Sequence, residues 1–336
     1  MKKKFIIMLS LFLIMALLPM LSIKETTALY KKELSGEPQS ESVPSDNINS
    51  SDRSFIILDT ATEKTIHISD KEFLYGAVAY EMPPSFEEEA LKAQAVAAYT
   101  YFCRLREHER KTPSAGLNGA DFSADLNEGQ FYYSNSLLKE KWGALYNDSI
   151  KKIKKACDSV YGQVLTGKDG ELIDAAYHAI SSGSTENASD VFGFESEYLR
   201  AVASPGDIYA PDYITDTVFS LDEFKERLRS ADGNIIFSGK AEEYIKKIDR
   251  TSSGTVRKIN ICGTELTGSQ IRTAFALRSA AFEIEYAGGL FTFTVRGYGH
   301  GVGMSQYGAQ SMAKNGADYQ EILQHYYGNA VLHTIQ

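Results

Sequence analysis

From residue 53 onward, the hydrophobic positions switch between the period of a β-strand and that of an α-helix. Apolar and β-branched runs at Phe55–Asp59 and Thr65–Ile68 flank a polar turn, which predicts a β-hairpin. Ser69-Asp-Lys-Glu72 has the spacing of a capping box, and apolar residues follow it at helical spacing. A helix should therefore begin here and end near Glu81, because a Pro-Pro pair follows directly.

The rest of the chain continues this mixture. Capping boxes and apolar periodicity predict helices from Ser85 to about Arg106, over Leu137–Val160, at Met304–Lys314 and after Asp318. Gly-containing turns predict hairpins of Gln163–Thr166 with Glu171–Tyr177 and of Phe282–Tyr286 with Leu290–Val295. A final strand is predicted at Ala330–Ile335. Residues 205–250 are charged and predict a helical insertion with helices at Leu221–Arg229 and Ala241–Ile248. This mixture of hairpins and helices is typical of the α+β class, and we expect a single large mixed domain over residues 53–336.

The N-terminus has a different pattern. Lys2, Lys3 and Lys4 precede an uncharged apolar run over Phe5–Ile23, which is just long enough to span a bilayer as a helix. Lysines on that side favour a cytoplasmic N-terminus and export of the rest. A cleaved secretory signal is the alternative; because no clean small-x-small site follows, we favour a retained anchor over residues 1–23. Residues 24–52, rich in Ser, Asn, Glu and Pro, are typical of a flexible linker.

Composition narrows the class of protein. The chain has 336 residues, of which 43% are hydrophobic and 24% charged, with a net charge of -9. These values are typical of a globular protein, and the acidic balance argues against a nucleic-acid partner. Three scattered cysteines, at positions 103, 157 and 262, are too few for a disulfide scaffold or a four-cysteine zinc site.

Glu81 is the first candidate for chemistry. It stands at the predicted end of a helix and directly before Met82-Pro83-Pro84, rather than within a charged helix face. A carboxylate at this end meets the negative pole of the helix dipole, which favours the protonated form that a general acid needs. From position alone, an ordinary surface glutamate remains the commoner explanation.

Two loops are further candidates. His178 opens a small-residue loop whose hydroxyls and N–H groups suit a polyhydroxylated or anionic ligand. The second loop, Gly297–Gly303, has glycine at every other position around His300, and it matches neither a dinucleotide motif nor a P-loop. No His-Glu-x-x-His metal motif and no G-x-S-x-G serine elbow occurs in the sequence.

Together these stretches resemble the stage II sporulation protein D family, which is also described with an amidase-enhancer domain. The matching pieces are Tyr80-Glu-Met-Pro83 with the Ala-rich Glu89–Ala98, then His178–Glu186, then Gly297–Ala309. They lie in the family's order and span most of residues 55–330.

The resemblance implies a peptidoglycan lytic transglycosylase that acts during engulfment in sporulation, outside the cytoplasm and tethered to the mother-cell membrane facing the septal wall. Such enzymes cut between N-acetylmuramic acid and N-acetylglucosamine, preferably on strands stripped of stem peptides. The implied partners, besides the glycan strands, are the amidase stage II sporulation protein P and the membrane protein stage II sporulation protein M. The alternative is a non-catalytic module that binds peptidoglycan and activates an amidase.

The resemblance also assigns roles to residues. The family's catalytic glutamate, in its Glu-Met-Pro motif, is Glu81 here, acting first as acid and then as base. Tyr99 stands where the family often has arginine, so any binding role of that arginine is in doubt. No cofactor is expected: some relatives bind zinc through Cys and His, but no Cys adjoins His178. The candidate substrate-binding residues are Lys92, Gln94, His178, Ser181, Ser182, Thr185, Gly299, His300, Gly301, Ser305, Gln306 and Tyr307.

Overall fold

Helices and mainly antiparallel strands make up the computed structural model, which describes residues 53–126 and 129–335 and confirms the α+β class. The expected anchor (residues 1–23) and linker (residues 24–52) lie outside the described residues. Within the described part of the chain, no helix is long and apolar enough to cross a membrane. The described chain divides into two compact units: a helical unit of residues 53–177 and 309–335, and a sheet unit of residues 178–308. The hydrophobic pattern predicts one domain over residues 53–336 and does not reveal this division.

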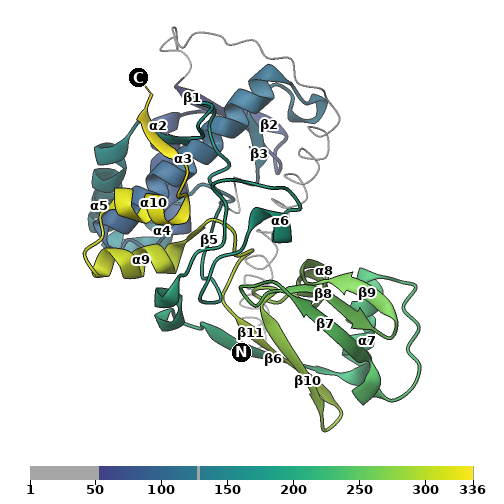
Figure 1. The fold of residues 1–336 in the computed structure, drawn as a ribbon. Helices are drawn as coiled ribbons and strands as arrows, with labels where there is room; N and C mark the ends of the chain where they lie inside the picture. The colour runs from purple at the N-terminus through teal and green to yellow at the C-terminus, as the bar shows by residue number, and fades with distance from the viewer. Residues whose placement is uncertain (1–52, 127–128, 336) are drawn as a thin grey trace. The chain divides into compact units, whose positions relative to one another are not determined.

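The helical unit is built around α3 (Glu88–Lys111), which contacts α2 (Asp70–Glu81), α5 (Tyr146–Val160) and α10 (Tyr319–Tyr326) (Figure 1). The remaining elements of this unit are β1 (Ser54–Asp59), β2 (Lys64–Ser69), β3 (Phe122–Ala124), α4 (Asn135–Trp142), β4 (Gln163–Thr166), β13 (Val331–Thr334) and two short 3-10 turns at Ala115–Leu117 and Gly143–Leu145. The predicted hairpin of β1 and β2 is confirmed, with β3 added in parallel to β1.

The core of this unit combines small and aromatic side chains. Alanines of α3 from Ala90 to Ala98 are buried, which lets neighbouring helices approach closely. Rings of Phe55, Phe73 and Phe102 pack mainly edge to face, with centroids 4.7–6.4 Å apart. Such pairs stabilise the fold by about 0.5–1.5 kcal/mol each beyond the burial of their area.

Helix α2 is fixed at its start by two independent devices. The hydroxyl of Ser69 accepts a hydrogen bond from the backbone N–H of Glu72 at 3.2 Å, as the capping spacing predicts. Asp70, the first helical residue, is buried, and its two carboxyl oxygens accept hydrogen bonds from the hydroxyls of Tyr99 and Tyr161, each at 2.6 Å. The residue in the family's arginine position therefore ties α2 to α3.

Three local expectations in the helical unit are wrong. The capping box at Ser85 does not form; α3 begins at Glu88, because Phe86 is buried in a turn closed by its own N–H and the carbonyl of Pro83 at 3.0 Å. The helix over Leu137–Val160 is interrupted at Gly143, whose φ of 51° lies in the left-handed region. The partner of β4 is β13, and the predicted strand Glu171–Tyr177 is reduced to a bridge at Leu172 and to β5 (Tyr177–His178).

The sheet unit contains two three-stranded sheets, ordered β10-β11-β6 and β7-β8-β9. Their strands and helices are β6 (Ile214–Ser220), α7 (Leu221–Ala231), β7 (Ile245–Arg250), β8 (Val256–Ile261), β9 (Thr264–Thr267), α8 (Gly268–Phe275), β10 (Phe282–Ala287) and β11 (Leu290–Arg296). The predicted hairpin of β10 and β11 is confirmed. Both sheets and both helices contribute to one apolar core, in which Phe224 stacks on Phe291 at 3.7 Å.

The helical insertion expected over residues 205–250 is only partly helical. The helix at Leu221–Arg229 is confirmed as α7, but Ala241–Ile248 divides into a 3-10 turn, Ala241–Glu243, and strand β7. Pairing with β8 determines the strand conformation of this segment, and no pattern within the segment itself predicts it. Short elements complete this unit: α6 (Ala188–Val191), a 3-10 turn at Pro205–Tyr209 and β12 (Met304–Ser305). The chain passes between the units within β5 and again within α9 (Gln306–Lys314).

Removing the Tyr99 hydroxyl should weaken the start of α2. Tyr99→Phe leaves a buried carboxyl group with one hydroxyl donor instead of two, so we expect the free energy of unfolding to fall by about 1–3 kcal/mol. Denaturant titration measures this. Tyr146→Phe removes an exposed hydroxyl that donates to Asn135 at 3.2 Å, and it should cost less than about 0.5 kcal/mol. Equal effects of the two variants would contradict the assignment.

Candidate functional site

Glu81 is the last residue of α2, as the two prolines predict, and its side chain is half-buried. The next residue, Met82, leaves the helix in an extended conformation with its side chain buried, and its N–H still donates to the carbonyl of Val78 at 2.9 Å. The helix end is therefore held by both a hydrogen bond and an apolar anchor. The carboxyl group lies at the negative pole of the α2 dipole, which favours its neutral form.

Tyr177 is electrostatically coupled to Glu81 and to tyrosines from other segments of the helical unit. Burial and the negative charge of Glu81 raise the pKa of Tyr177 well above its ordinary value, and the nearby phenols of Tyr80, Tyr101 and Tyr327 act in the same direction. Tyr327 is itself fixed, because its hydroxyl donates to the carbonyl of Ala176 at 2.7 Å. Tyr177 thus stays a neutral phenol near neutral pH. The sequence analysis misses Tyr177, since nothing local distinguishes it from a strand residue.

The two candidates on α3 differ in accessibility. Gln94 is completely buried on the inner side of the helix. Lys92 is half-buried, and its ammonium pairs with Glu89 at 2.7 Å and with Glu88 at 3.4 Å, which raises its pKa. Glu89 also accepts the N–H of Tyr319 at 3.0 Å, so this network joins α3 to the start of α10. Sugar binding by Lys92 and Gln94 stays a prediction.

The glycine loop of the sheet unit packs closely against the His178 loop. Four alternate glycines, from Gly297 to Gly303, all have positive φ. At Gly299, with φ of 119°, an added Cβ would come within 2.7 Å of the Cβ of His178. Glycine is needed here for both conformation and space, which explains the alternation seen in the sequence.

His178 is buried and neutral. Its Nδ1–H donates to the carbonyl of Val302 at 3.1 Å, which leaves Nε2 as an acceptor without a hydrogen-bond partner among the described residues. Burial, reinforced by the positive charge of Arg272, lowers the pKa of His178 to about 4. The ring of His300, which is half-buried, lies 5.6 Å from that of His178. A neutral imidazole of this kind can accept a hydrogen bond but carries no charge near neutral pH.

Gly301 brings a buried acid to the same loop. Its carbonyl accepts the N–H of Glu186 at 2.8 Å, and Glu186 is 1% exposed. One carboxyl oxygen of Glu186 accepts the hydroxyl of Thr251 at 2.9 Å, and burial raises its pKa. Glu186 therefore belongs to the framework of these loops.

Asp207 organises two of the predicted hydroxyl residues and was not a sequence candidate. This fully buried carboxyl group accepts the hydroxyl of Ser305 at 2.7 Å and both the hydroxyl and the N–H of Ser181. Burial raises its pKa. Ser181 and Ser305 thus share one internal acceptor.

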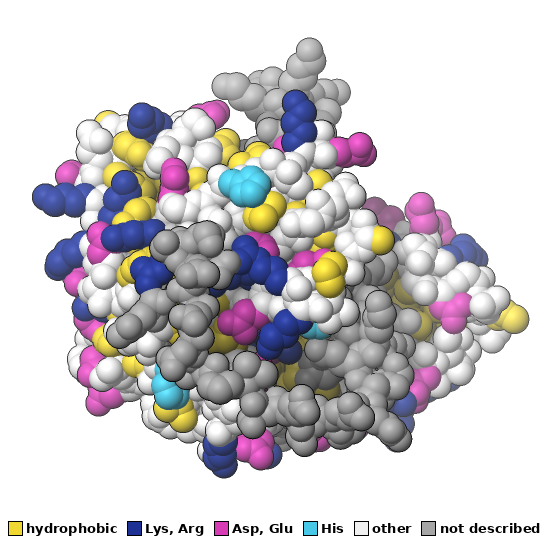
Figure 2. Space-filling view, turned by 90° about the horizontal axis from the view of Figure 1, so that it is seen from above, with side chains coloured by type: hydrophobic (Ala, Val, Ile, Leu, Met, Phe, Trp, Pro, Cys, Tyr) yellow, Lys and Arg dark blue, Asp and Glu magenta, His cyan; other side chains and the backbone are white. Residues whose placement is uncertain are grey.

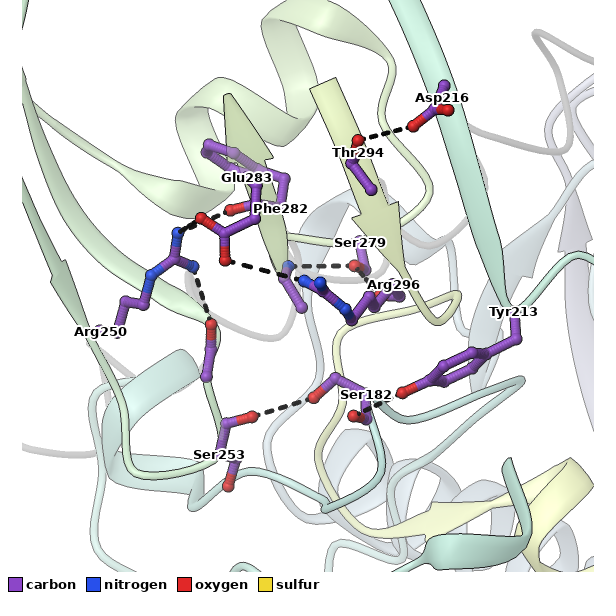
Figure 3. Close-up of polar contacts among 12 residues, drawn as sticks. Ser182, Tyr213, Asp216, Arg250, Ser253, Ser279, Phe282, Glu283, Thr294 and Arg296 are labelled. Carbon is purple, nitrogen blue, oxygen red and sulfur yellow. Dashed lines mark hydrogen bonds and ion pairs between the residues drawn. The ribbon is translucent and has the colours of Figure 1, made fainter. Parts of the chain in front are cut away.

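The other small polar candidates also have internal partners. The hydroxyl of Ser182 donates to the carbonyl of Ser253 at 3.1 Å, while the carbonyl of Ser182 accepts the hydroxyl of Tyr213 at 2.8 Å (Figure 3). Thr185 is fully buried and accepts the N–H of Val202 at 2.9 Å.

Two candidates lie where β12 leads into α9. Gln306 is buried, and Tyr307 is half-buried with its N–H donating to the carbonyl of Ala179 at 3.1 Å. The candidates accordingly form two groups: Glu81, Lys92 and Gln94 in the helical unit, and the rest in the sheet unit. Among the described residues, no group of three or more His, Cys, Asp or Glu side chains could hold a metal ion.

Comparison with known proteins agrees with this arrangement of motifs. A family model described as "Stage II sporulation protein" matches residues 59–166. Stage II sporulation protein D of Bacillus amyloliquefaciens is 38% identical over 80% of this chain and 75% of its own length. The Bacillus subtilis protein of that name is 36% identical over 88% of this chain and 83% of its own. The amidase enhancer of Bacillus subtilis is 27% identical over 77% of this chain and 40% of its own length.

The protonation of His178 can be tested directly. Because the folded state disfavours the imidazolium, we expect a titration midpoint near 4, against about 6.5 for an exposed histidine. Between these values only the unfolded state takes up the proton, so this residue lowers the stability of the fold as the pH falls from 6.5 towards 4. NMR of labelled histidine measures the midpoint, and His178→Gln identifies its signal among the six histidines. A midpoint near 6.5 would contradict the buried, neutral assignment.

Proposed function

Because the chain belongs to the stage II sporulation protein D family, we propose that it is a lytic transglycosylase that cleaves peptidoglycan glycan strands during engulfment in sporulation. The substrate is a strand stripped of its stem peptides, cut between N-acetylmuramic acid and N-acetylglucosamine. The observation that carries this proposal is the position of Glu81 as the last residue of α2, where a backbone hydrogen bond and the buried side chain of Met82 fix the end of the helix.

The reaction needs one group that gives a proton and takes one back. Neutral Glu81 donates its proton to the glycosidic oxygen as the bond from C1 of muramic acid to that oxygen breaks. The resulting carboxylate then accepts the proton of the muramic C6 hydroxyl, whose oxygen bonds to C1. Glu81 is neutral again, and the products are a free hydroxyl and a 1,6-anhydro end. No second carboxylate is required, unlike in a hydrolysing glycosidase.

The surroundings of Glu81 support the first stage. The helix dipole favours the neutral acid before cleavage. Tyr177 does not compete as an acid, since its pKa lies well above the ordinary value. In this mechanism Glu81 is the catalytic residue.

The cellular setting belongs to the same proposal. An amidase such as stage II sporulation protein P would supply strands without stem peptides, and stage II sporulation protein M would be a membrane partner. Retention of residues 1–23 as an anchor would keep the enzyme at the membrane that faces the septal wall.

A second candidate function is a binding module that stimulates an amidase. The similarity to a protein named amidase enhancer favours it. The two candidates separate in a simple assay: a pure enhancer releases no sugar fragments from stripped strands by itself, yet accelerates an added amidase.

Replacing the catalytic carboxyl group should abolish the chemistry and leave the fold intact. For Glu81→Gln, we expect release of anhydro-ended fragments to fall by about 10²–10⁴-fold, because loss of a general acid or base typically costs that much. Mass spectrometry of digests of stripped strands measures the rate, and Glu87→Gln, at a neighbouring exposed glutamate, is the matched control. Undiminished release by Glu81→Gln would refute the mechanism.

A further inference from the structure

A groove of about 250 Å³ lies on the helical unit, away from the candidate residues named so far. Its walls come from α2, α4, α5 and the segment before α4, including Tyr75, Tyr132, Tyr133 and Leu138. Polar and charged side chains line it as well, including Lys71, Glu72, Asn135 and Lys154. The groove therefore combines aromatic surface with charged groups.

A close backbone contact shapes the groove. Gly76 of α2 is buried, and its carbonyl accepts the N–H of Tyr133 at 3.2 Å. A Cβ at this position would lie 2.2 Å from ring atoms of Tyr132, so only glycine lets the tyrosine segment lie on the helix. The groove is therefore part of the folded framework of α2.

The same segment leads from the groove to the catalytic carboxyl group. The ring of Tyr133 lines the groove and packs edge to face on Tyr80, with centroids 5.0 Å apart. Tyr80 immediately precedes Glu81, and Gly76 and Glu81 are separated by about 7–8 Å along the helix axis. The groove and the catalytic carboxyl group therefore lie less than two helical turns apart on α2.

Lysines outnumber acidic side chains at the groove: Lys71 and Lys154 line it together with Glu72, and Lys141 lies over the ring of the lining residue Tyr133. Helices α4 and α5 carry six lysines, although the whole chain has a net charge of -9. On the face shown in Figure 2, basic and acidic side chains are interspersed and form no single basic patch. Binding of an anion therefore depends on individual unpaired ammonium groups and not on the area of a basic surface. The ammonium of Lys154 lies 5.2 Å from the ring centroid of Tyr75, and that of Lys141 lies 5.1 Å from that of Tyr133. Within the described part of the chain, neither ammonium forms an ion pair within 4.0 Å, although Lys154 interacts electrostatically with Asp158, which pairs with Lys71 at 3.0 Å. The Lys155 ammonium, by contrast, pairs with Glu88 at 2.6 Å.

We propose that this groove is an accessory glycan subsite, in which Lys141 and Lys154 bind the free lactyl carboxylate of a muramic acid residue. The proposal rests on the proposed function, and it names what would make stripped strands the preferred substrate. Removal of a stem peptide converts a neutral amide on muramic acid into a carboxylate. Two unpaired ammonium groups beside an aromatic wall recognise that carboxylate and not the amide.

The test measures binding of stripped glycan strands to the full chain carrying Glu81→Gln, so that cleavage does not interfere. The groove variant is Lys141→Ala with Lys154→Ala. The matched control is Lys139→Ala with Lys151→Ala, which removes the same charge from the same two helices; the Lys139 ammonium lies over the ring of Tyr146 and not over a tyrosine that lines the groove. A third probe is the same strand preparation with its carboxylates converted to methylamides.

We expect the groove variant to bind stripped strands about tenfold more weakly, because charge-assisted hydrogen bonds are lost, while the control variant binds normally. The methylamide strands should bind weakly to all three proteins, without a difference among them. Equal losses in the two double variants, an equal loss on methylamide strands, or unchanged binding by the groove variant would each overturn the proposal.

The outcome stays separate from that of the proposed chemistry. Cleavage is assayed on the chain with native Glu81, whereas the binding measurements use Glu81→Gln throughout. Absence of anhydro products together with carboxylate-dependent binding would refute the transglycosylase and leave the subsite standing. Cleavage to anhydro products without any effect of the groove lysines on binding would support the transglycosylase and refute the subsite.

Discussion

The position of Glu81 depends on contacts that fix both ends of helix α2. At the start, the buried carboxyl group of Asp70 accepts two tyrosine hydroxyls, from α3 and from the residue that follows α5. At the end, two prolines forbid a further turn, and buried Met82 anchors the exit of the chain. Because both ends of the helix are held, the backbone of its last residue keeps one position within the helical unit.

The sheet unit uses buried polar groups in place of a helix to fix its loops. Asp207 draws Ser181 and Ser305 together, and Gly299 lets the glycine loop lie directly on His178. Satisfied buried networks of this kind give a loop one conformation, because each lost partner would leave a polar group unpaired in a dry interior. The hydroxyl-rich loop that looks like a row of ligand donors in the sequence is thus largely occupied with internal partners. His178 differs, since its Nε2 has no hydrogen-bond partner within the described residues.

Local signals in the sequence predict some features well and others not at all. Capping residues and prolines place α2 and its last residue, and turn glycines place the hairpin of β10 and β11, because these depend on neighbours in the chain. The pattern of Ala241–Ile248 predicts a helix, whereas Ile245–Arg250 form strand β7 because they pair with β8, the next strand along the chain. Tyr177 and Asp207 are not predicted from the sequence, because their roles arise from burial beside residues that are remote in sequence. The resemblance of motifs singled out Glu81, whereas its electrostatic coupling to Tyr177 required the structure.

In the proposed mechanism, one carboxyl group promotes ring closure within the sugar instead of activating water. Digestion of stripped glycan strands in water enriched with heavy oxygen, followed by mass spectrometry of the new ends, tests it most directly. This mechanism predicts 1,6-anhydro ends that contain no oxygen from the solvent, since the C6 hydroxyl is the nucleophile. Reducing ends that carry one heavy oxygen at C1 would show hydrolysis and contradict the account.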